Sequence, residues 1–476
     1  MVKNVCHHLH LLLLLVFVVG ISQYWVRQVH ADSHSPPIKF LPGFPGPLPF
    51  HLQTGYVGVD ENEDAQLFYY FVKSERNPTE DPLIIWLSGG PGCSSFFALS
   101  YEIGPLYFKK VDYNGTLPTL VRNLNSWTKI ANIIFLDSPV GTGFSYGRTS
   151  SASHSTDTKA CALALQFLRK WFIGHPEFRS NPFYVGGDSY SGIIVPILTQ
   201  MISNRNEAGL EQFVNLKGYL LGNPKTFPAD QDFVIPFAHG MGIISDELYE
   251  SLKQSCRSGY EKQDTDSLEC SRCLDAFDQL RSGLFYEQVL ENICDEYPPE
   301  LRRSLSDKKE VFMHGSAERT NIKSSSSVLK CRFAGYRLCR YWFNNDNVRK
   351  ALRVRKGTTG EWERCRDALP YEYDVSDSRV YHANLSRKGY KSLIYSGDHD
   401  MIVPFQSTQS WIRDLNYSIV DEWRPWIVQG QYAGYTRAYS NKMTFATVKG
   451  AGHTAPEYKP AECYAMFERW ISDKPL

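Results

Sequence analysis

Residues 182–192 read PFYVGGDSYSG, in which a short apolar run passes directly into a turn of small residues. Residues 193–202, which follow, have the composition of a helix. A serine on a tight strand-to-helix turn needs small residues two positions to either side, because larger side chains would collide with neighbouring backbone. Gly187 and Ser191 meet that need around Ser189. The stretch predicts a nucleophilic serine at this elbow; taken alone, it can also be a glycine- and serine-rich loop without catalysis.

Two later loops supply the partners that a nucleophilic serine requires. A serine hydroxyl needs a base to remove its proton during attack, and that base needs a third group to orient it. An apolar run at 392–395 precedes a loop with Asp398 and Asp400, and another at 443–448 precedes a small-residue loop with His453. Asp398 stands where it can serve the turn by side-chain hydrogen bonding. Asp400 is therefore the expected acid and His453 the expected base.

The wider pattern of short apolar runs predicts the fold class. Runs that are apolar on both faces suit a parallel sheet covered by helices, whereas a half-exposed strand would alternate. Further runs lie at 82–87, 132–136 and 216–221, and amphipathic helical patterns at 156–173 and 460–471. Alternating strands and helices predict a mostly parallel, doubly wound α/β sheet. The order Ser189, Asp400, His453, each after a strand, is that of an α/β-hydrolase fold.

A glycine-rich loop offers donors for the oxyanion that forms on attack, which must be stabilised by preorganised N–H groups. Residues 88–95, SGGPGCSS, follow directly on the 82–87 run. The backbone N–H groups of Gly90 and Tyr190 are the expected donors. A phosphate-cradling loop is the competing interpretation, but it would need a Gly-Lys-Ser/Thr ending that this loop lacks.

The N-terminus indicates entry into the secretory pathway. Lys3, an apolar run at 11–19 and a small-residue pattern ending at Ala31 predict a signal peptide over residues 1–31. That run is too short to span a bilayer and no other segment approaches ~20 apolar residues, so no membrane span is expected. We expect a vacuolar or extracellular protein. Expected glycosylation sites are the sequon residues Asn114, Asn384 and Asn416.

Charge and cysteine content exclude some classes of function. The 51 Lys plus Arg equal the 51 Asp plus Glu, whereas a nucleic-acid binder would carry a basic excess or stripe. In an oxidising compartment the cysteines predict disulfides. The clustered candidates are Cys256, Cys270, Cys273 and Cys294. Cys270 and Cys273 have zinc-ligand spacing, but no matching second pair follows nearby. No metal or organic cofactor is expected.

Residues 229–377 break the rhythm of strands and helices, being rich in charge, cysteine and aromatic residues. We expect an inserted cap between a first core part at 32–228 and a second at 378–476, over the carboxyl ends of the strands where ligands bind in such folds. Inside the cap, a charged and serine-rich stretch near 304–327 is expected to be a surface loop open to proteolytic processing. The mature protein is accordingly expected to be a monomer or a processed two-chain heterodimer.

Together the motifs resemble a known family, the serine carboxypeptidases and the plant serine carboxypeptidase-like acyltransferases. The resemblance covers essentially the whole mature chain. It rests on residues 86–95, 136–146, 187–192 and 341–352, the Asp400 loop and residues 450–460. It implies the Ser189, Asp400 and His453 triad with Gly90 and Tyr190 as oxyanion donors. It also implies a disulfide from Cys93 to the Cys331 region and further bridges in the cap, while Cys339 and Cys365 leave the pairing unsettled.

The two branches of this family differ in how they hold the substrate. In peptidase members an Asn in the glycine loop and a Glu just before the nucleophile bind the terminal carboxylate. Ser88, beside Gly89, and Asp188 occupy those substrate-binding places here. Because both side chains are shorter, the carboxylate clamp has less reach.

This combination, with Ser191 and the stretches 423–426 and 434–437, resembles the acyltransferase branch. Such enzymes take an acyl group, often phenolic, from a 1-O-β-glucose ester and transfer it to an alcohol or amine in plant specialised metabolism. The expected partners are therefore a small acyl donor and an acceptor. A serine-type carboxypeptidase is the alternative. A non-catalytic secreted binding protein is disfavoured because serine, acid, base and oxyanion loop are all present.

Overall fold

The computed structural model describes residues 36–209, 214–256, 267–293 and 331–476. The expected signal peptide at 1–31 and the expected processed loop near 304–327 lie outside these residues. The strands of the main sheet are β1 (Leu52–Val59), β2 (Ala65–Val72), β3 (Leu83–Leu87), β6 (Asn132–Leu136), β7 (Tyr146–Gly147), β9 (Phe183–Asp188), β10 (Leu216–Gly222), β12 (Lys391–Gly397), β13 (Ile419–Val428), β14 (Gln431–Tyr439) and β15 (Met443–Val448). Two small sheets pair β4 (Leu106–Phe108) with β5 (Leu120–Arg122) and β8 (Ser155–Thr156) with β11 (Tyr371–Glu372).

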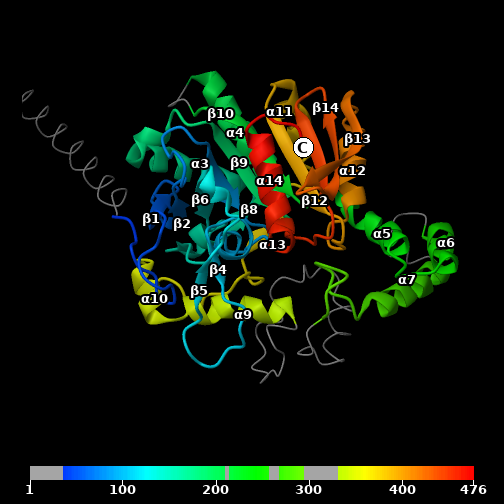
Figure 1. Cartoon of the computed structure of the whole chain (residues 1–476), viewed down its shortest axis with the longest axis horizontal. Coiled ribbons are helices and arrows are strands. Elements are labelled where there is room, and N and C mark those ends of the chain that lie inside the picture. Colours follow the sequence, from blue (N-terminus) through cyan, green and yellow to red (C-terminus); the bar gives the residue numbers. More distant parts are fainter. Residues whose placement is uncertain (1–35, 210–213, 257–266, 294–330) are drawn as a thin grey trace, which may run out of the picture.

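The main sheet has the order β1-β2-β6-β3-β9-β10-β12-β15-β14-β13, with β7 beside β2 (Figure 1). From β6 to β15 the neighbouring strands are parallel, whereas β1, β2, β14 and β13 pair antiparallel at the two edges. The apolar runs recognised in the sequence form the parallel part, and nearly all their residues are buried. A mostly parallel central sheet is thus confirmed; the antiparallel edges were not foreseen.

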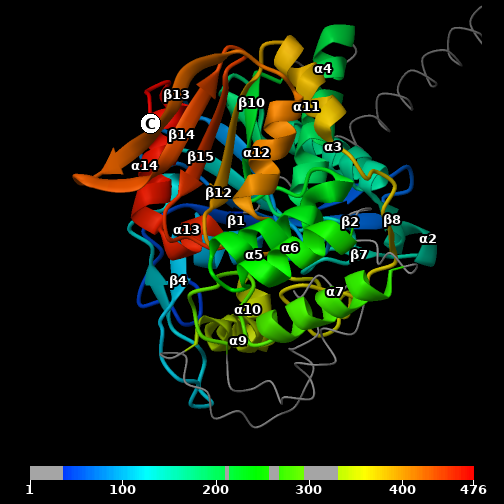
Figure 2. The ribbon, with the colours of Figure 1, turned by 90° about the vertical axis from the view of Figure 1, so that its right-hand side faces the viewer.

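Helices cover both faces of the sheet. The helices are α2 (Ser150–Ser153), α3 (Asp157–Gly174), α4 (Ser191–Ala208), α5 (Val234–Gly240), α6 (Asp246–Ser255), α7 (Leu268–Arg281), α9 (Arg332–Phe343), α10 (Asp346–Ala351), α11 (Arg379–Arg387), α12 (Phe405–Asp414), α13 (Ala455–Tyr458) and α14 (Pro460–Ile471). Residues of α3, α4, α11 and α12 share one apolar core with the sheet, and residues of α9 and α14 share another. Figure 2 shows α4, α11 and α12 on one side of the strands and α14 on the other.

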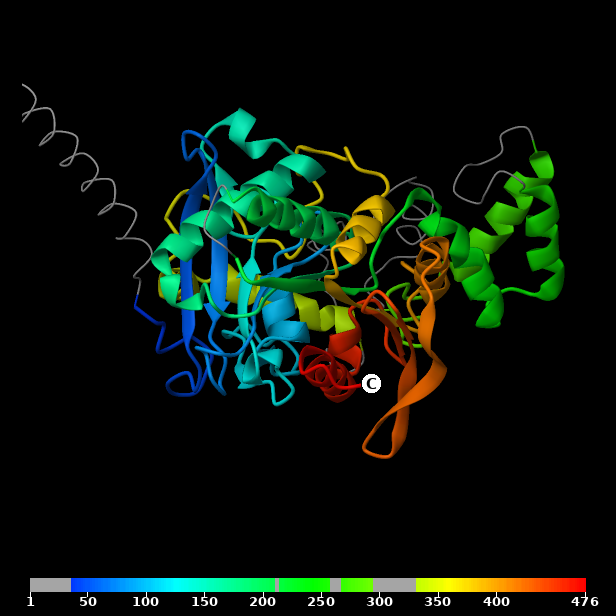
Figure 3. The ribbon, with the colours of Figure 1, turned by 90° about the horizontal axis from the view of Figure 1, so that it is seen from above.

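The segment at 229–377 divides into two parts. Helices α5, α6 and α7 extend to one side of the molecule (Figure 3) and have an apolar cluster of their own, to which Met401 of the core also belongs. Helices α9 and α10 instead pack into the core on the α14 side. The expected boundaries at 229 and 377 stay a prediction. In the described part of the chain, no helix combines the length and apolarity needed to cross a bilayer.

The C-terminal helix α14 closes the core beneath the parallel strands. Phe467 is fully buried and stacks on Trp127, with ring centroids 4.2 Å apart. We expect Phe467→Ala to lower the free energy of unfolding by about 3–5 kcal/mol, because it removes buried surface and leaves a cavity. Urea unfolding measures the change. Glu468→Ala on the exposed side of the same helix is the control, and an equal loss in both variants would contradict the packing argument.

Candidate active site

Ser189 lies at a sharp elbow between β9 and α4. Its φ of 56° is left-handed, a conformation that costs a non-glycine residue of order 1–3 kcal/mol unless its surroundings enforce it. Its N–H donates to Gly222 O at 2.9 Å. A Cβ on Gly187 would lie 2.5 Å from Leu87 O and 2.7 Å from the Ser191 side chain. Glycine at 187 and a small residue at 191 are thus required, as expected for a serine at a strand-to-helix elbow.

The structure brings Ser189, His453 and Asp400 into one hydrogen-bonded chain. His453 Nε2 lies 2.8 Å from Ser189 Oγ, and His453 Nδ1 lies 2.7 Å from Asp400 Oδ2. All three side chains are buried. With the proton on Nδ1 donated to Asp400, Nε2 can accept the hydroxyl proton of Ser189. The arrangement can therefore activate a serine nucleophile.

Asp400, and not Asp398, is the acid in contact with His453. The N–H groups of Ile402 and Val403 and the side-chain amide of Asn223 also donate to its carboxylate, at 2.8, 3.2 and 2.8 Å. Asp398 instead accepts from the Gly450 N–H and contacts His399, so it serves the turn. Asn223 was missed by sequence reasoning, although its place at the end of β10 is the same strand-end signal that found Asp400.

Opposing effects act on the pKa of His453. Burial lowers it, but the charge and hydrogen bond of Asp400 and the nearby Glu287 and Asp188 outweigh burial, so that the pKa of His453 is raised. Because the pKa is raised, the imidazole stays protonated up to a higher pH. In its protonated form it cannot act as a base. Activity through His453 should therefore decline on the acid side.

The glycine loop lies directly against the elbow. A Cβ on Gly89 would come 2.6 Å from the Ser189 Cβ and 2.8 Å from the Tyr190 backbone N, so only glycine fits there. Gly89 and Gly90 line one cavity together with Ser189. The structure thus brings the glycine loop that carries Gly90 against the backbone of Tyr190, the other expected oxyanion donor, next to the reacting serine.

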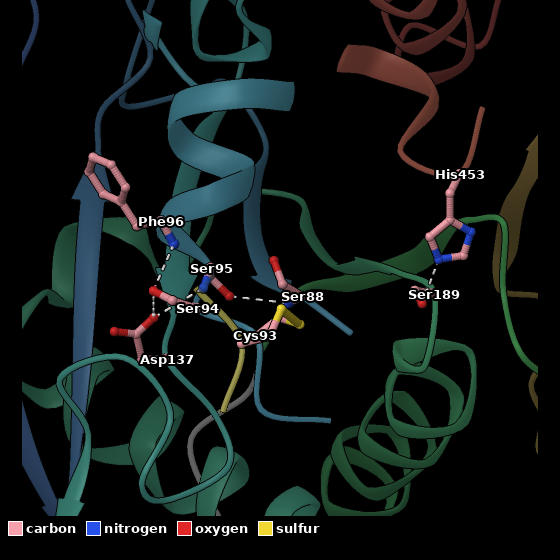
Figure 4. The surroundings of a disulfide bond; sticks show 9 residues. Ser88, Cys93, Ser94, Ser95, Phe96, Asp137, Ser189 and His453 are labelled. Carbon is pink, nitrogen blue, oxygen red and sulfur yellow. Dashed lines mark hydrogen bonds between the residues drawn. A yellow bond between two sulfur atoms is a disulfide. The ribbon is translucent and has the colours of Figure 1, made fainter. Parts of the chain in front are cut away.

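Asp137, at the end of β6, fixes the course of this loop. Its carboxylate accepts hydrogen bonds from Ser94 Oγ at 2.6 Å, Ser95 N at 3.0 Å and Phe144 N at 3.1 Å. Figure 4 shows the Ser94 side chain directed at Asp137, the Ser95 hydroxyl turned instead toward Ser88, and Ser189 facing His453. Burial raises the pKa of Asp137 to about 7, against these hydrogen bonds, which lower it.

The disulfide expected between Cys93 and the Cys331 region was wrong. Cys93 bonds to Cys365, because the backbones of their neighbours pair: Ser94 N donates to Arg364 O at 2.8 Å, and Arg366 N to Gly92 O at 3.0 Å. Cys331 is disulfide-bonded elsewhere. The bridge joins the glycine loop to the 364–366 segment, which sequence spacing gave no means of pairing.

The clustered cysteines of the 229–377 segment are only partly as expected. Cys256, at the end of α6, bonds to Cys270 in the first turn of α7. Cys273 is a buried free thiol, so its assignment as a disulfide residue was wrong: Cys270 already occupies the position facing Cys256. Cys294 lies outside the described residues.

The cavity beside Ser189, here called the Ser189 cavity, is lined by polar groups from three parts of the chain. They are Ser88 and Gly90 of the glycine loop, Asp188 of the elbow, and Glu287 and Arg364 of the 229–377 segment. Burial raises the pKa of Asp188 to about 7, partly opposed by the charge of His453 and by backbone N–H groups. Burial also raises the pKa of Glu287, against the charges of Arg364 and His453. Glu287 and Arg364 carried no recognisable sequence signal.

A short strap, residues 286–289, connects this segment to both loops that carry the acid and the base. Its backbone accepts hydrogen bonds from Met401 N at 3.0 Å and from His453 N at 2.7 Å, and donates from Val289 N to His399 O at 3.2 Å. The strap thus contacts the residues on both sides of Asp400 and the backbone of His453. It fixes the separation of these two loops.

The three sequon asparagines differ in their surroundings. Asn114, between β4 and β5, and Asn416, after α12, are exposed. Asn384 lies on α11, is half-buried, and donates to Gln200 Oε1 at 3.2 Å. Glycosylation of all three stays a prediction, and the exposed Asn114 and Asn416 are more accessible to a glycan than Asn384.

Among the described residues, no group of three or more His, Cys, Asp and Glu side chains is placed to hold a metal ion.

A serine, an imidazole and a carboxylate carried on loops at the ends of β9, β15 and β12 define an α/β-hydrolase. A solved structure of Kex1(Δ)p, a prohormone-processing carboxypeptidase from Saccharomyces cerevisiae, has the same fold: the TM-score is 0.69 at 21% identity, over 92% of this chain and 94% of that one. The expected fold class is confirmed.

The chain belongs to the serine carboxypeptidase family, whose signature matches residues 42–473. It is therefore a serine-dependent enzyme. Serine carboxypeptidase-like 12 of Arabidopsis thaliana is 50% identical over 469 residues, covering 98% of this chain and 99% of that protein. Serine carboxypeptidase-like 19 of the same plant is 52% identical over 444 residues, covering 92% and 94%. The resemblance drawn from the motifs is confirmed at the level of the family.

Replacing Asp400 should change both rate and pH dependence. We expect Asp400→Asn to lower kcat by about three to four orders of magnitude, because the amide no longer orients or charge-balances the imidazole. Since Asp400 raises the pKa of His453, its loss should move the acid limb of the kcat/KM profile to lower pH. Asp398→Asn is the matched control and should move neither. A large loss of kcat in Asp398→Asn, with little change in Asp400→Asn, would instead assign the role of the acid to Asp398.

The raised pKa of Asp188 should make stability depend on pH in an unusual direction. The folded state retains the proton between the ordinary value of 3.8 and about 7, so stability falls as pH rises through this window. Asp188→Asn, which is always neutral, should raise the thermal midpoint by a few degrees at about pH 8 and leave it unchanged at about pH 4. The exposed Asp112→Asn should change neither midpoint; a gain at acidic pH alone would refute the prediction.

Proposed function

We propose that the protein is an acyltransferase that moves an acyl group, phenolic in our expectation, from a 1-O-β-glucose ester to an alcohol acceptor. Ser189 is the nucleophile, His453 the general base and acid, and Asp400 the orienting carboxylate. The observation that carries the proposal is the buried chain in which Ser189 Oγ lies 2.8 Å from His453 Nε2 and His453 Nδ1 lies 2.7 Å from Asp400 Oδ2. Family membership supports serine-dependent chemistry.

The reaction proceeds in two half-reactions. Ser189 Oγ bonds to the ester carbonyl carbon while its proton passes to His453 Nε2, and the N–H groups of Gly90 and Tyr190 stabilise the resulting oxyanion. The glucose oxygen then leaves with the proton from His453, and an acyl-Ser189 ester remains. In the second half the acceptor hydroxyl gives its proton to His453 and attacks the acyl carbon. The bond to Ser189 Oγ then breaks, His453 returns the proton to that oxygen, and the new ester is released.

Transfer requires that the acceptor reach the acyl-serine before water does. A hydroxyl held beside His453 gains a large effective concentration over water. Ser88 Oγ and Asp188 Oδ1, in the Ser189 cavity, are buried and make no hydrogen bond within the described residues. With its pKa near 7, Asp188 is protonated under acidic conditions and can donate to a substrate oxygen. These groups suit a polyhydroxylated ligand and support the acyltransferase branch.

A serine carboxypeptidase is the second candidate, and one observation favours it. Arg364, a buried cation, lines the Ser189 cavity, where it can attract the terminal carboxylate of a peptide. A secretory destination, vacuolar or extracellular, is part of either proposal, and the disulfides fit an oxidising compartment.

A competition assay decides between the two candidates. Purified protein receives several acylglucoses, an alcohol acceptor and a blocked dipeptide together, and mass spectrometry identifies the products. We expect acyl transfer to exceed peptide cleavage, and Ser189→Ala to abolish both, a loss of about six orders of magnitude in kcat. Predominant release of C-terminal residues would establish the carboxypeptidase. Unchanged transfer by Ser189→Ala would refute the proposed mechanism.

A further inference from the structure

We propose that Asp157 is a positioning residue for the oxyanion hole, acting through the side chain of Tyr190. This inference rests on the proposed function, in which the Tyr190 N–H stabilises the oxyanion. Tyr190 follows Ser189 directly and precedes α4, so its backbone forms the second half of the elbow. The Asp157 carboxylate, on another helix, holds the far end of its side chain.

The contacts converge on a single carboxylate. Tyr190 Oη donates to Asp157 Oδ1 at 2.7 Å, and Tyr371 Oη donates to the same oxygen at 2.7 Å. The other oxygen, Oδ2, accepts from the N–H groups of Asp374 and Val375 at 2.8 and 2.9 Å. Asp157 is itself fully buried. A carboxylate that accepts four hydrogen bonds in an enclosed site has one orientation, and it imposes that orientation on its partners.

The local sequence places Asp157 for this role. It is the first residue of α3, where Thr156 caps the helix and the helix dipole favours a negative charge. Helix α3 packs against α4, the helix that begins just after Tyr190. The rings of Tyr190 and Tyr373 also pack edge to face, with their centroids 5.6 Å apart. Asp157 thus joins α3, the elbow and the segment at 371–375.

The direction of the Tyr190 N–H depends on this contact. Ser189 is held in a left-handed conformation, and a small rotation of the next peptide would turn the Tyr190 N–H away from the oxyanion without disturbing substrate binding. Removing a whole oxyanion donor costs about 10²–10³ in kcat. Loosening a donor that remains present should cost less, about tenfold, and should appear in kcat while KM stays the same.

Two matched variants separate positioning from simple stabilisation. Tyr190→Phe and Tyr371→Phe each remove one 2.7 Å hydrogen bond to the same Asp157 oxygen, but only Tyr190 belongs to the elbow. We expect Tyr190→Phe to lower kcat about tenfold with KM unchanged, and Tyr371→Phe to leave kcat within about twofold. The melting temperatures of the two variants should fall by similar amounts. Equal losses of kcat in both variants, or none in Tyr190→Phe, would overturn the inference.

A double-mutant cycle tests whether the effect passes through Asp157. Asp157→Asn should lower kcat at least as much as Tyr190→Phe, and the double variant should lose no more than Asp157→Asn alone, because both changes break one connection. Additive losses would contradict the proposed route. Ser189→Ala, assayed in parallel, separates failure of the proposed function from failure of this inference. Full activity of Ser189→Ala refutes the proposed function, whereas an unchanged kcat in Tyr190→Phe refutes only the role of Asp157.

Discussion

The left-handed backbone of Ser189 is the constraint on which the site depends. A serine adopts this conformation only when its surroundings compensate for the strain, and here three elements do so. Gly187 lets β9 and β3 approach, Gly89 lets the glycine loop touch the serine, and the Gly222 carbonyl at the end of β10 accepts the serine N–H. The parallel sheet therefore supplies the contacts that hold Ser189 in its strained conformation.

Buried carboxylates hold the loops around this serine. Asp137 fixes the glycine loop, Asp157 fixes the elbow through Tyr190, and Asp400 fixes the imidazole. Each replaces water with hydrogen bonds from N–H and O–H groups, which is what a charge needs in a low-dielectric interior. Burial raises the pKa of Asp188 and Glu287 in the Ser189 cavity, as it also raises that of Asp137.

Local signals in the sequence predicted much of this arrangement. Continuous apolar runs identified the parallel strands because burial on both faces removes alternation, and the small residues around Ser189 identified the elbow because the steric requirement there is local. The antiparallel edges escaped notice: β2 is wholly buried and was not separated from its surroundings, and β13 is largely exposed.

Features that depend on long-range pairing could not be predicted in the same way. Cys93 and Cys365 meet because two distant backbones form a bridge, which no spacing rule encodes. Glu287 and Arg364 line the Ser189 cavity from two separate stretches that are neither helix nor strand and have no periodicity. Asn223 had a local signal, because it is a polar residue at a strand end, although it belongs to no motif.

The strap at 286–289 would hold the enzyme together if the chain were cleaved between residues 294 and 330. Ser189 and the strap precede residues 294–330, while Asp400 and His453 follow them. Cleavage there would divide the nucleophile and its base between two polypeptides, so neither fragment could react alone. The hydrogen bonds that the N–H groups of Met401 and His453 donate to the strap would then become intermolecular contacts, and they would keep the divided enzyme in register.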